Sequence, residues 1–367
     1  MICFDKTQEV LCTFLKETEG IFSDLLDSHG FCGEAKIIPS VDLGFPHDVI
    51  RVSGGFATGA FVQWESKMPI VPVDTCVNVC SASFYELSDS ILSFFDEDEY
   101  GKFNGQLGQG IYISNFHRGN HFISLLESTL TGKFFLVLHS SASEFKKNYN
   151  GLYPSLESRF REKVKTHYSK GRYLRYIEGG VAELFYKLAS NLYEFNSNRH
   201  DFIADMIVGD RAKVLNASVF HHYGMPSQSS VVMGSHVNKI GDIAPVLTLP
   251  GKNIFMIKYN RCICDELFIP NTDTFLTPHG WGKTHVNSPK ISFDLKSNRF
   301  FLDDKFYDIE FGSSLRDHPN LQLREFSFGE DTDCSFWKHF SKCYEYEIID
   351  EFSQIASINK SAIKIWI

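Results

Sequence analysis

The sequence of 367 residues lacks the features that mark several classes of protein. It contains no apolar run approaching the roughly 20 residues that a membrane-spanning helix needs. It has no internal repeat, no low-complexity tract and no Pro/Ser-rich linker, so nothing divides the chain into separate units. Residues 1–5 show no basic stretch before an apolar one, which predicts no secretory signal. We therefore expect one cytoplasmic domain over residues 1–367, without a membrane partner.

Basic residues are also in deficit. The 36 Lys and Arg face 45 Asp and Glu, which gives a formal net charge of −9. Proteins that coat nucleic acid non-specifically are usually basic, because the phosphate backbone attracts cations. Nucleic acid would therefore have to bind at a local patch. The nine Cys are odd in number and show no zinc-finger spacing, which indicates free thiols in a reducing compartment.

Hydrophobic periodicity predicts a mixture of helices and strands in irregular order. Apolar residues recur at helical spacing over 7–28, 84–96 and 179–207, and a helix followed by a short strand is expected within 344–367. Strands are predicted at 71–79, 133–139, 230–233, 253–259 and 291–295, with a hairpin over 299–311. This order favours the α+β class, with mixed sheets flanked by helices.

Several residues of metal-ligand type lie in apolar settings. Asp74 and Cys76 fall inside a predicted buried strand, where an unpaired carboxylate would be costly and needs a metal ion or a hydrogen-bonding partner. His139 ends the predicted strand FFLVL, and His121 follows a turn. A lone histidine or a buried cysteine is more often structural than a ligand. Asp, Cys and imidazole together, however, suit Mn, Fe, Co or Zn.

One basic segment opposes the acidic total, and it carries Phe160, Tyr168 and Tyr173 between its cations. Its basic residues are Arg159, Arg161, Lys163, Lys165, Lys170, Arg172 and Arg175. Phosphates bind such cations and unstacked bases bind aromatic faces, so we expect RNA contacts here, chiefly from the first four and Arg172. The alternative is a solvated surface segment whose aromatic rings pack inward.

Short blocks of the chain follow, in order, those of a known family. The blocks are DVIRVSGGFATGAFV (48–62), VPVDTCVNVC (71–80), RGNHF (118–122), LVLHSSAS (136–143), YKLASNLYEFNSNR (186–199), FHH (220–222), LTLPGKNIFMI (247–257) and TPHGWGK (277–283). Together they resemble the RtcB family of RNA ligases, which join RNA 2′,3′-cyclic phosphate or 3′-phosphate ends to 5′-hydroxyl ends. The resemblance covers about 44–284 and implies a function in RNA repair or splicing.

The resemblance implies a reaction that depends on GTP and two Mn²⁺ ions. His279 would attack GTP and carry GMP, which then activates the RNA 3′-phosphate. The implied metal ligands are Asp74, Cys76, His121, His139 and His222, with Cys80 as the alternative thiol. The implied nucleotide contacts are Asn120, Pro250, Gly251, Lys252, Gly280, Gly282 and Lys283.

The nucleotide motifs depart from the family pattern more than the metal motifs do. Lys283 stands where the family has arginine, and Trp281 stands where it has alanine. The family's terminal Lys-Gly is replaced by Ile-Trp-Ile, with Lys364 the nearest lysine. Two alternatives therefore stay open. One is a metal-dependent phosphodiesterase that acts on RNA ends, and the other is an RNA-binding protein on the same fold that has lost guanylylation.

Overall fold

The computed structural model describes residues 3–30, 33–107, 116, 121–142, 159–280, 282–310, 313–324, 335–359 and 362–366. It confirms the α+β class, since helices pack on several antiparallel sheets. The helices are α1 (Lys6–Ser28), α2 (Val49–Ser53), α3 (Glu97–Leu107), α5 (Gly180–Val208) and α6 (Ser335–Cys343). Within the described ranges, no helix is long and apolar enough to cross a membrane.

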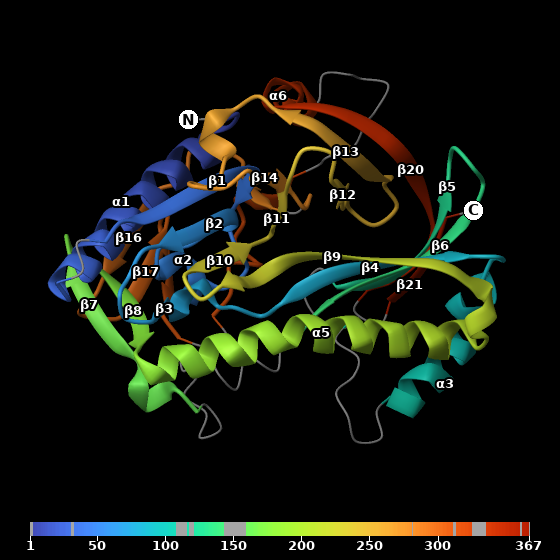
Figure 1. Ribbon diagram of the computed structural model, residues 1–367, viewed down its shortest axis with the longest axis horizontal. Coiled ribbons are helices and arrows are strands. Elements are labelled where there is room, and N and C mark those ends of the chain that lie inside the picture. The colour runs from blue at the N-terminus through green and yellow to red at the C-terminus, as the bar shows by residue number, and fades with distance from the viewer. Residues whose placement is uncertain are drawn as a thin grey trace.

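The largest sheet is antiparallel throughout and curves strongly. In spatial order its strands are β1 (Ala35–Gly44), β2 (Thr58–Trp64), β10 (Ser230–Met233), β9 (Val214–Ser227), β4 (Cys80–Leu87), β6 (Phe134–Ser141), β5 (Phe122–Ser128), β20 (Tyr344–Asn359), β13 (Ile254–Cys262) and β12 (Ile243–Val246), while β21 (Ala362–Ile365) pairs with β20. Figure 1 shows β9 and β4 above α5, whereas β13 and β20 cross the opposite side of the molecule. Strands far apart in the sequence therefore face a common interior.

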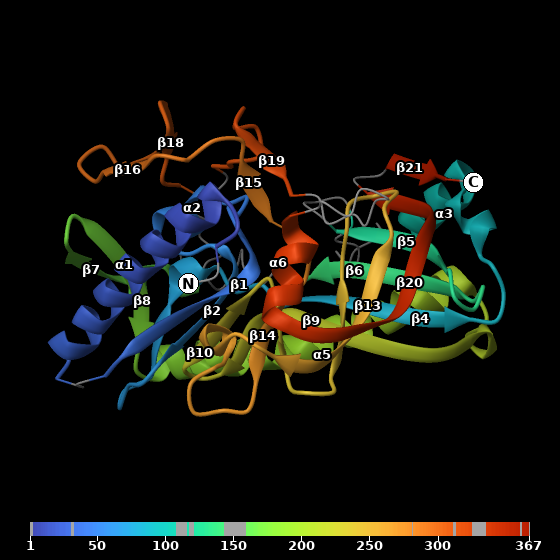
Figure 2. The same cartoon turned by 90° about the horizontal axis from the view of Figure 1, so that it is seen from above.

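Four smaller sheets complete the fold, and in Figure 2 their labelled strands lie toward the β1 and β2 end of the main sheet. They are β3 (Ile70–Pro72) with β8 (Arg172–Glu178) and β7 (Lys165–Ser169), β11 (Ser235–Asn238) with β14 (Phe275–Pro278), β15 (Lys283–His285) with β19 (Leu321–Leu323), and β16 (Ile291–Asp294) with β17 (Arg299–Leu302) and β18 (Lys305–Asp308). The β11–β14 pair matters most for function, because it brings the 279–280 turn to the main sheet.

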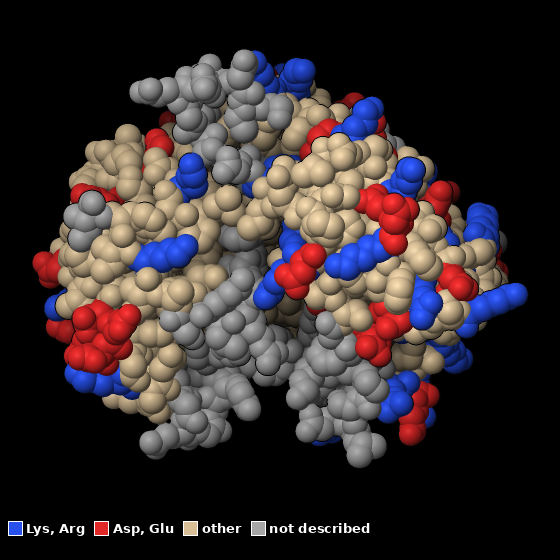
Figure 3. Space-filling model, turned by 180° about the vertical axis from the view of Figure 1, so that it is seen from behind, with Lys and Arg blue, Asp and Glu red and all other residues tan. Residues whose placement is uncertain are grey.

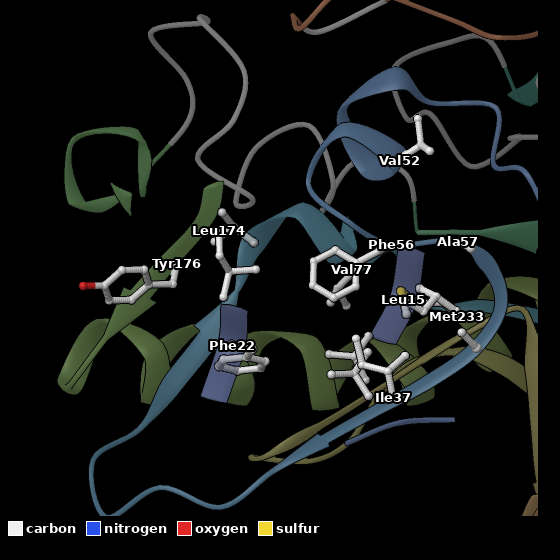
Figure 4. Packing of buried hydrophobic residues seen from close by; sticks show 14 of the residues in the cluster. Leu15, Phe22, Ile37, Val52, Phe56, Ala57, Val77, Leu174, Tyr176 and Met233 are labelled. Atoms are coloured by element: carbon white, nitrogen blue, oxygen red, sulfur yellow. The ribbon is translucent and has the colours of Figure 1, made fainter. Parts of the chain in front are cut away.

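The main helices form where the sequence predicts them. Asp5 caps α1, accepting a hydrogen bond from the Gln8 amide at 2.8 Å, and the helix buries one apolar face. Figure 4 shows Leu15 and Phe22 of that face among residues from several strands. Helix α5 ends at Gly209, whose φ of +72° suits glycine at a helix end.

Two predicted helices are strands in the structure. Residues 80–87 form β4, followed by a 3-10 turn over Leu92–Phe95, and residues 344–359 form the long strand β20. The apolar residues Phe84, Leu87, Ile91 and Phe95 recur at helical spacing, although the first two belong to β4 and the last belongs to the 3-10 turn. Strand β20 contains two register shifts against β13, which interrupt its two-residue period.

Candidate metal centre

Three neighbouring strands present Cys80, His139 and His222 on the sheet face opposite α5. Side chains alternate between the two faces of a strand, so the residues next to these ligands point the other way. Ser81 accepts a hydrogen bond from Asn196 of α5, at 2.6 Å. His221, the neighbour of His222, stacks edge-on with Tyr193 of α5, with ring centroids 4.7 Å apart. The register of β4, β6 and β9 thus gathers the three ligand-type residues.

The same helix buries His200 behind the site. Its Nδ1 lies 2.7 Å from the Ser83 hydroxyl and its Nε2 lies 2.7 Å from the Ser140 hydroxyl. Arg199 also donates to Ser140, at 3.4 Å. These contacts hold β4 and β6 in register from the face opposite the ligands. His200 therefore has a structural role, which agrees with its place in the helix predicted over 179–207.

The two separations from His139 match those that a tetrahedral cation requires. His139 Nε2 lies 3.4 Å from Cys80 Sγ and 3.2 Å from His222 Nε2, and all three atoms lie within 4.8 Å of one another. Tetrahedral bonds of about 2.0 Å to nitrogen and 2.3 Å to sulfur require ligand separations of about 3.3–3.6 Å. His121 Nε2 lies farther out, 3.9 Å from the Cys80 sulfur. The group can hold one cation with three ligands and one open position.

The protonation of His222 suits this role. Its Nδ1 lies 3.3 Å from the Phe220 carbonyl oxygen, which can only accept, so the ring proton resides on Nδ1. The Nε2 lone pair therefore faces His139 and Cys80. Burial and the neighbouring imidazoles hold the pKa of His222 well below its usual range. Burial also raises the pKa of the Cys80 thiol to about 12, so a cation would have to displace its proton.

His279 adjoins this group and is oriented by a buried carboxylate. Its ring stacks on that of His222, with centroids 5.2 Å apart and planes inclined by 30°. Asp42 Oδ2 accepts hydrogen bonds from Nδ1 of His279 at 2.9 Å and from the backbone amides of His279 and Gly280 at 3.1 Å. Because the Nδ1 proton is directed at Asp42, Nε2 keeps the lone pair that a nucleophile needs.

Besides His121, which lies farther out, two further predicted ligands do not join the cluster. Asp74 lies in the 3-10 turn Val73–Thr75 and is fully buried against Arg175, with contacts of 2.9 and 3.0 Å between guanidinium and carboxylate. Cys76 adopts a φ of +51° and packs with Ile50. Among the described residues, the thiol within ligand distance of the histidines is Cys80. The interpretation is corrected accordingly: a guanidinium satisfies Asp74, and Cys80 replaces Cys76.

The predicted nucleotide residues fall into two groups. Gly280 (φ +99°) belongs to the His279 turn, where a Cβ would lie 1.9 Å from the Leu247 carbonyl oxygen. Gly282 passes close to the backbone of Asp42. Pro250, Gly251 and Lys252 form an exposed turn before β13, and the ring of Trp366 lies against Gly251. Asn120 lies outside the described residues.

Lys283 does not present its charge to the centre. Its side chain is buried, and its ammonium donates to the carbonyl oxygens of Leu315 and Arg316 at 3.3 and 2.9 Å. A cation that neutralises a nucleotide phosphate must be able to reach it. The expectation that Lys283 binds nucleotide therefore finds no support in its contacts.

The predicted RNA-binding segment is exposed only in part. Arg159, Arg161, Lys163 and Lys165 are exposed, and Lys165 pairs with Glu178. Arg172 is buried instead: its guanidinium lies over the Phe14 ring, 4.0 Å from the centroid, and donates to the Thr18 hydroxyl at 2.8 Å. The expectation that Arg172 contacts RNA is wrong, because this side chain anchors β8 to α1.

The sequence interpretation missed Asp42 and His236. Asp42 is a fully buried carboxylate within a strand of apolar residues, the same signal that drew attention to Asp74. His236 lies on β11, buried 5.6 Å from the ring of His222, and its Nδ1 is 3.3 Å from the His221 carbonyl oxygen. Their proximity to His279 and His222 depends on strand pairings that the sequence does not display.

Comparison of the chain with protein-family models, with curated proteins and with solved structures gives no match.

Proposed function

We propose that this protein is a divergent RNA ligase of the RtcB type, which carries GMP on His279 and joins RNA 3′-phosphate ends to 5′-hydroxyl ends. The observation that carries the proposal is the pairing of Asp42 with His279 directly beside the Cys80–His139–His222 group. An oriented imidazole next to a cation site is the arrangement that nucleotidyl transfer needs. A reducing cytoplasm fits, because Cys80 must remain a free thiol.

The chain's own residues account for the first step. The Nε2 lone pair of His279 forms a bond to the α-phosphorus of GTP, the bond to the bridging oxygen breaks, and pyrophosphate leaves. Asp42 holds the Nδ1 proton and offsets the positive charge that the ring acquires. Cys80, His139 and His222 would hold the cation, which when bound polarises phosphoryl oxygens as a Lewis acid.

The next two steps transfer the guanylate and close the RNA. An oxygen of the RNA 3′-phosphate attacks the phosphorus on His279, and the nitrogen–phosphorus bond breaks. The 5′-hydroxyl of the second RNA then attacks the activated 3′-phosphate, so that a phosphodiester forms, GMP leaves and the hydroxyl proton passes to solvent. The ring of His279 returns to its starting state.

An end-joining assay tests this function. A labelled RNA with a 3′-phosphate is mixed with a 5′-hydroxyl RNA, GTP and either Mn²⁺ or Zn²⁺, and the joined product is measured by gel electrophoresis. We expect a product with the wild type and none with His279→Ala. The control is His29→Ala, which removes a partly exposed imidazole that contacts Glu178. Equal joining by His279→Ala and the wild type would refute the carrier role.

Gly234 supplies space for the His279 ring. Its φ is +75°, and a Cβ at this position would lie 3.0 Å from Cε1 and 3.3 Å from Nε2 of His279. Gly234→Ala should lower the free energy of unfolding by about 1–2 kcal/mol, because of the left-handed backbone, and should also displace the ring. We expect slower transfer of guanylate to His279, measured as the rate at which the protein gains the mass of one GMP.

Gly241→Ala is the matched control for Gly234→Ala. Gly241 has a φ of +91°, but nothing lies within 4 Å of its added Cβ. Gly234→Ala should lose more stability than Gly241→Ala in denaturant unfolding, because its Cβ would also lie 2.8 Å from Thr58 Cγ2, and only Gly234→Ala should lose transfer rate. The same loss of rate in both would mean that the ring contact has no part in the effect.

The exposed part of the basic segment is the proposed RNA contact. Replacing Arg159, Arg161 and Lys163 with Glu should weaken RNA binding and make log Kd less dependent on log salt concentration, by up to about one unit of slope per lost phosphate contact. Figure 3, which views the molecule from behind, shows Lys and Arg interspersed with Asp and Glu. This face offers no broad basic surface to RNA, which fits binding at a local patch. An unchanged salt slope in filter binding would exclude this segment.

One observation favours the second candidate, a metal-dependent phosphodiesterase. The Lys283 ammonium is bound to carbonyl oxygens and offers no charge to a nucleotide. A cation with an open coordination position needs no nucleotide to activate water. Cleavage of RNA 2′,3′-cyclic phosphate without GTP, retained in His279→Ala, would identify this alternative.

A further inference from the structure

Among the residues that the structure describes, two groups of side chains have the composition of metal sites. One is Cys80, His139 and His222, and the other is His285, Asp303 and His318. In the second group, His285 Nε2 lies 2.7 Å from Asp303 Oδ2, and the ligand atoms all lie within 4.8 Å of one another. Distance and residue type alone therefore do not show which group binds a metal ion. The positions of the protons on the histidine rings distinguish the two groups.

The second group has its protons in the wrong place for a cation. The backbone amide of Asn287 donates to Nδ1 of His285 at 3.0 Å, and that of Asn320 donates to Nδ1 of His318 at 3.2 Å. A ring nitrogen that accepts a hydrogen bond carries no proton, so each neutral ring is protonated on Nε2. His285 donates that proton to Asp303, and His318 directs its own to the Leu302 carbonyl at 3.3 Å.

Binding a cation at Nε2 would move each proton to Nδ1, where it would oppose a backbone N–H. Two hydrogen bonds would be lost together. Metal-ligating histidines normally donate their second ring N–H to an acceptor instead. The Asn320 side chain also donates to Asp303 Oδ2, at 2.9 Å, so the carboxylate already has partners. The second group is therefore a hydrogen-bonded clasp between the 285–290 and 302–320 segments.

The first group has the opposite arrangement. His222 donates from Nδ1 to the Phe220 carbonyl and turns its Nε2 lone pair toward His139 and Cys80. The donor set is one sulfur and imidazole nitrogens, with Asp74 held by Arg175 outside the group. Mn²⁺ is best suited by carboxylate, carbonyl and water oxygens, whereas thiolate with imidazole suits Zn²⁺. Two Mn²⁺ ions therefore do not fit the ligands that the described residues bring together.

We infer that the protein binds a single Zn²⁺-type ion, four-coordinate, through the Cys80 thiolate, His139 and His222, and leaves the fourth position open. His121 is the nearest further imidazole, and its greater distance from the Cys80 sulfur leaves room for a water or a phosphoryl oxygen. The inference deepens the proposed function by naming the ion and its number. It shares the site with that function, but its test involves neither GTP nor RNA.

Cobalt substitution provides the test, because Co²⁺ replaces Zn²⁺ and its spectrum reports ligands and geometry. The metal-free full-length chain is titrated with Co²⁺, and bound metal per chain is measured after desalting. We expect one ion per chain, a near-ultraviolet thiolate charge-transfer band and the intense visible bands of a four-coordinate ion. Cys80→Ser should abolish the charge-transfer band, whereas Cys76→Ser and His318→Ala should leave it unchanged.

Several results would overturn the inference. These are two ions per chain, a weak six-coordinate spectrum in the wild type, or a thiolate band that survives in Cys80→Ser but disappears in Cys76→Ser. The wild-type spectrum and metal content decide the matter even if a variant fails to fold, which circular dichroism would reveal. A single four-coordinate ion without a guanylate adduct would leave this inference standing and refute the proposed ligase. A guanylate adduct formed with two ions bound would support the proposed ligase and refute this inference.

Discussion

Asp42→Asn should slow the formation of the guanylate adduct on His279 by about 10³- to 10⁴-fold, the size of effect seen when an orienting aspartate beside a catalytic histidine becomes an amide. Asp42 Oδ2 accepts from Nδ1 of the ring and from two backbone amides. Because two backbone amides also donate to Oδ2, an Asn keeps its amide oxygen at this place and loses only the negative charge. The positive charge that the ring acquires when Nε2 attacks phosphorus is then no longer offset. Intact-protein mass spectrometry over time measures the rate.

Asp303→Asn is the matched control for this experiment. It alters the carboxylate that accepts from His285 Nε2 at 2.7 Å, in a partly buried Asp–His pair of similar length. Adduct formation should remain at the wild-type rate in this variant. Metal content should be normal in both variants, because neither residue is among the three proposed ligands. Equal rates for Asp42→Asn and the wild type would show that His279 does not depend on its carboxylate.

Arg175→Met should lower the free energy of unfolding by about 3–5 kcal/mol, because it leaves the Asp74 carboxylate buried without its ion-pair partner. Asp74 is fully buried and makes both of its short guanidinium contacts with Arg175. Denaturant unfolding at neutral pH measures the loss. The double variant Asp74→Asn/Arg175→Met should recover part of it, since the amide carries no charge.

The loss in Arg175→Met should depend on pH with a definite sign. Burial raises the pKa of the Asp74 carboxyl, and in the wild type Arg175 partly offsets that rise. In the variant the folded-state pKa lies well above the unfolded value of about 3.9, so the folded state holds more protons between the two. Stability therefore falls as the pH rises through this window. Unfolding curves at about pH 4 should show the variant closer to the wild type than curves at pH 7.

The sequence predicted the long helices, because a single buried face gives α1 and α5 a clear period, and it predicted the strands β6, β10, β13 and β16 from their apolar runs. The strand predicted at 71–79 is wrong, because β3 ends at Pro72 and a 3-10 turn follows at Val73–Thr75. The sequence pattern also failed where the end of a strand and a short turn follow each other. Phe84 and Leu87 of β4, with Ile91 and Phe95 after them, recur at helical spacing and so predicted a helix over 84–96. The long strand β20 was misread because its register shifts interrupt the alternation.

The candidate site was partly visible in the sequence. His139 and His222 were identified, but the choice between Cys76 and Cys80 depends on where the 3-10 turn ends and β4 begins. The two thiols are four residues apart, and Cys80, the first residue of β4, is the one beside the histidines. Asp42 could be suspected as a buried carboxylate, but its partner is 237 residues away and is set by the packing of the 279–280 turn against β1. Such long-range pairings leave no mark on local composition.

Intact-protein mass spectrometry of the metal-loaded wild type after incubation with GTP tests the central claim most directly. The account predicts a mass increase of one guanylate, located by peptide mapping on His279, and no increase in His279→Ala. A wild-type protein that holds its metal ion and gains no guanylate, or gains it on another residue, would contradict the account.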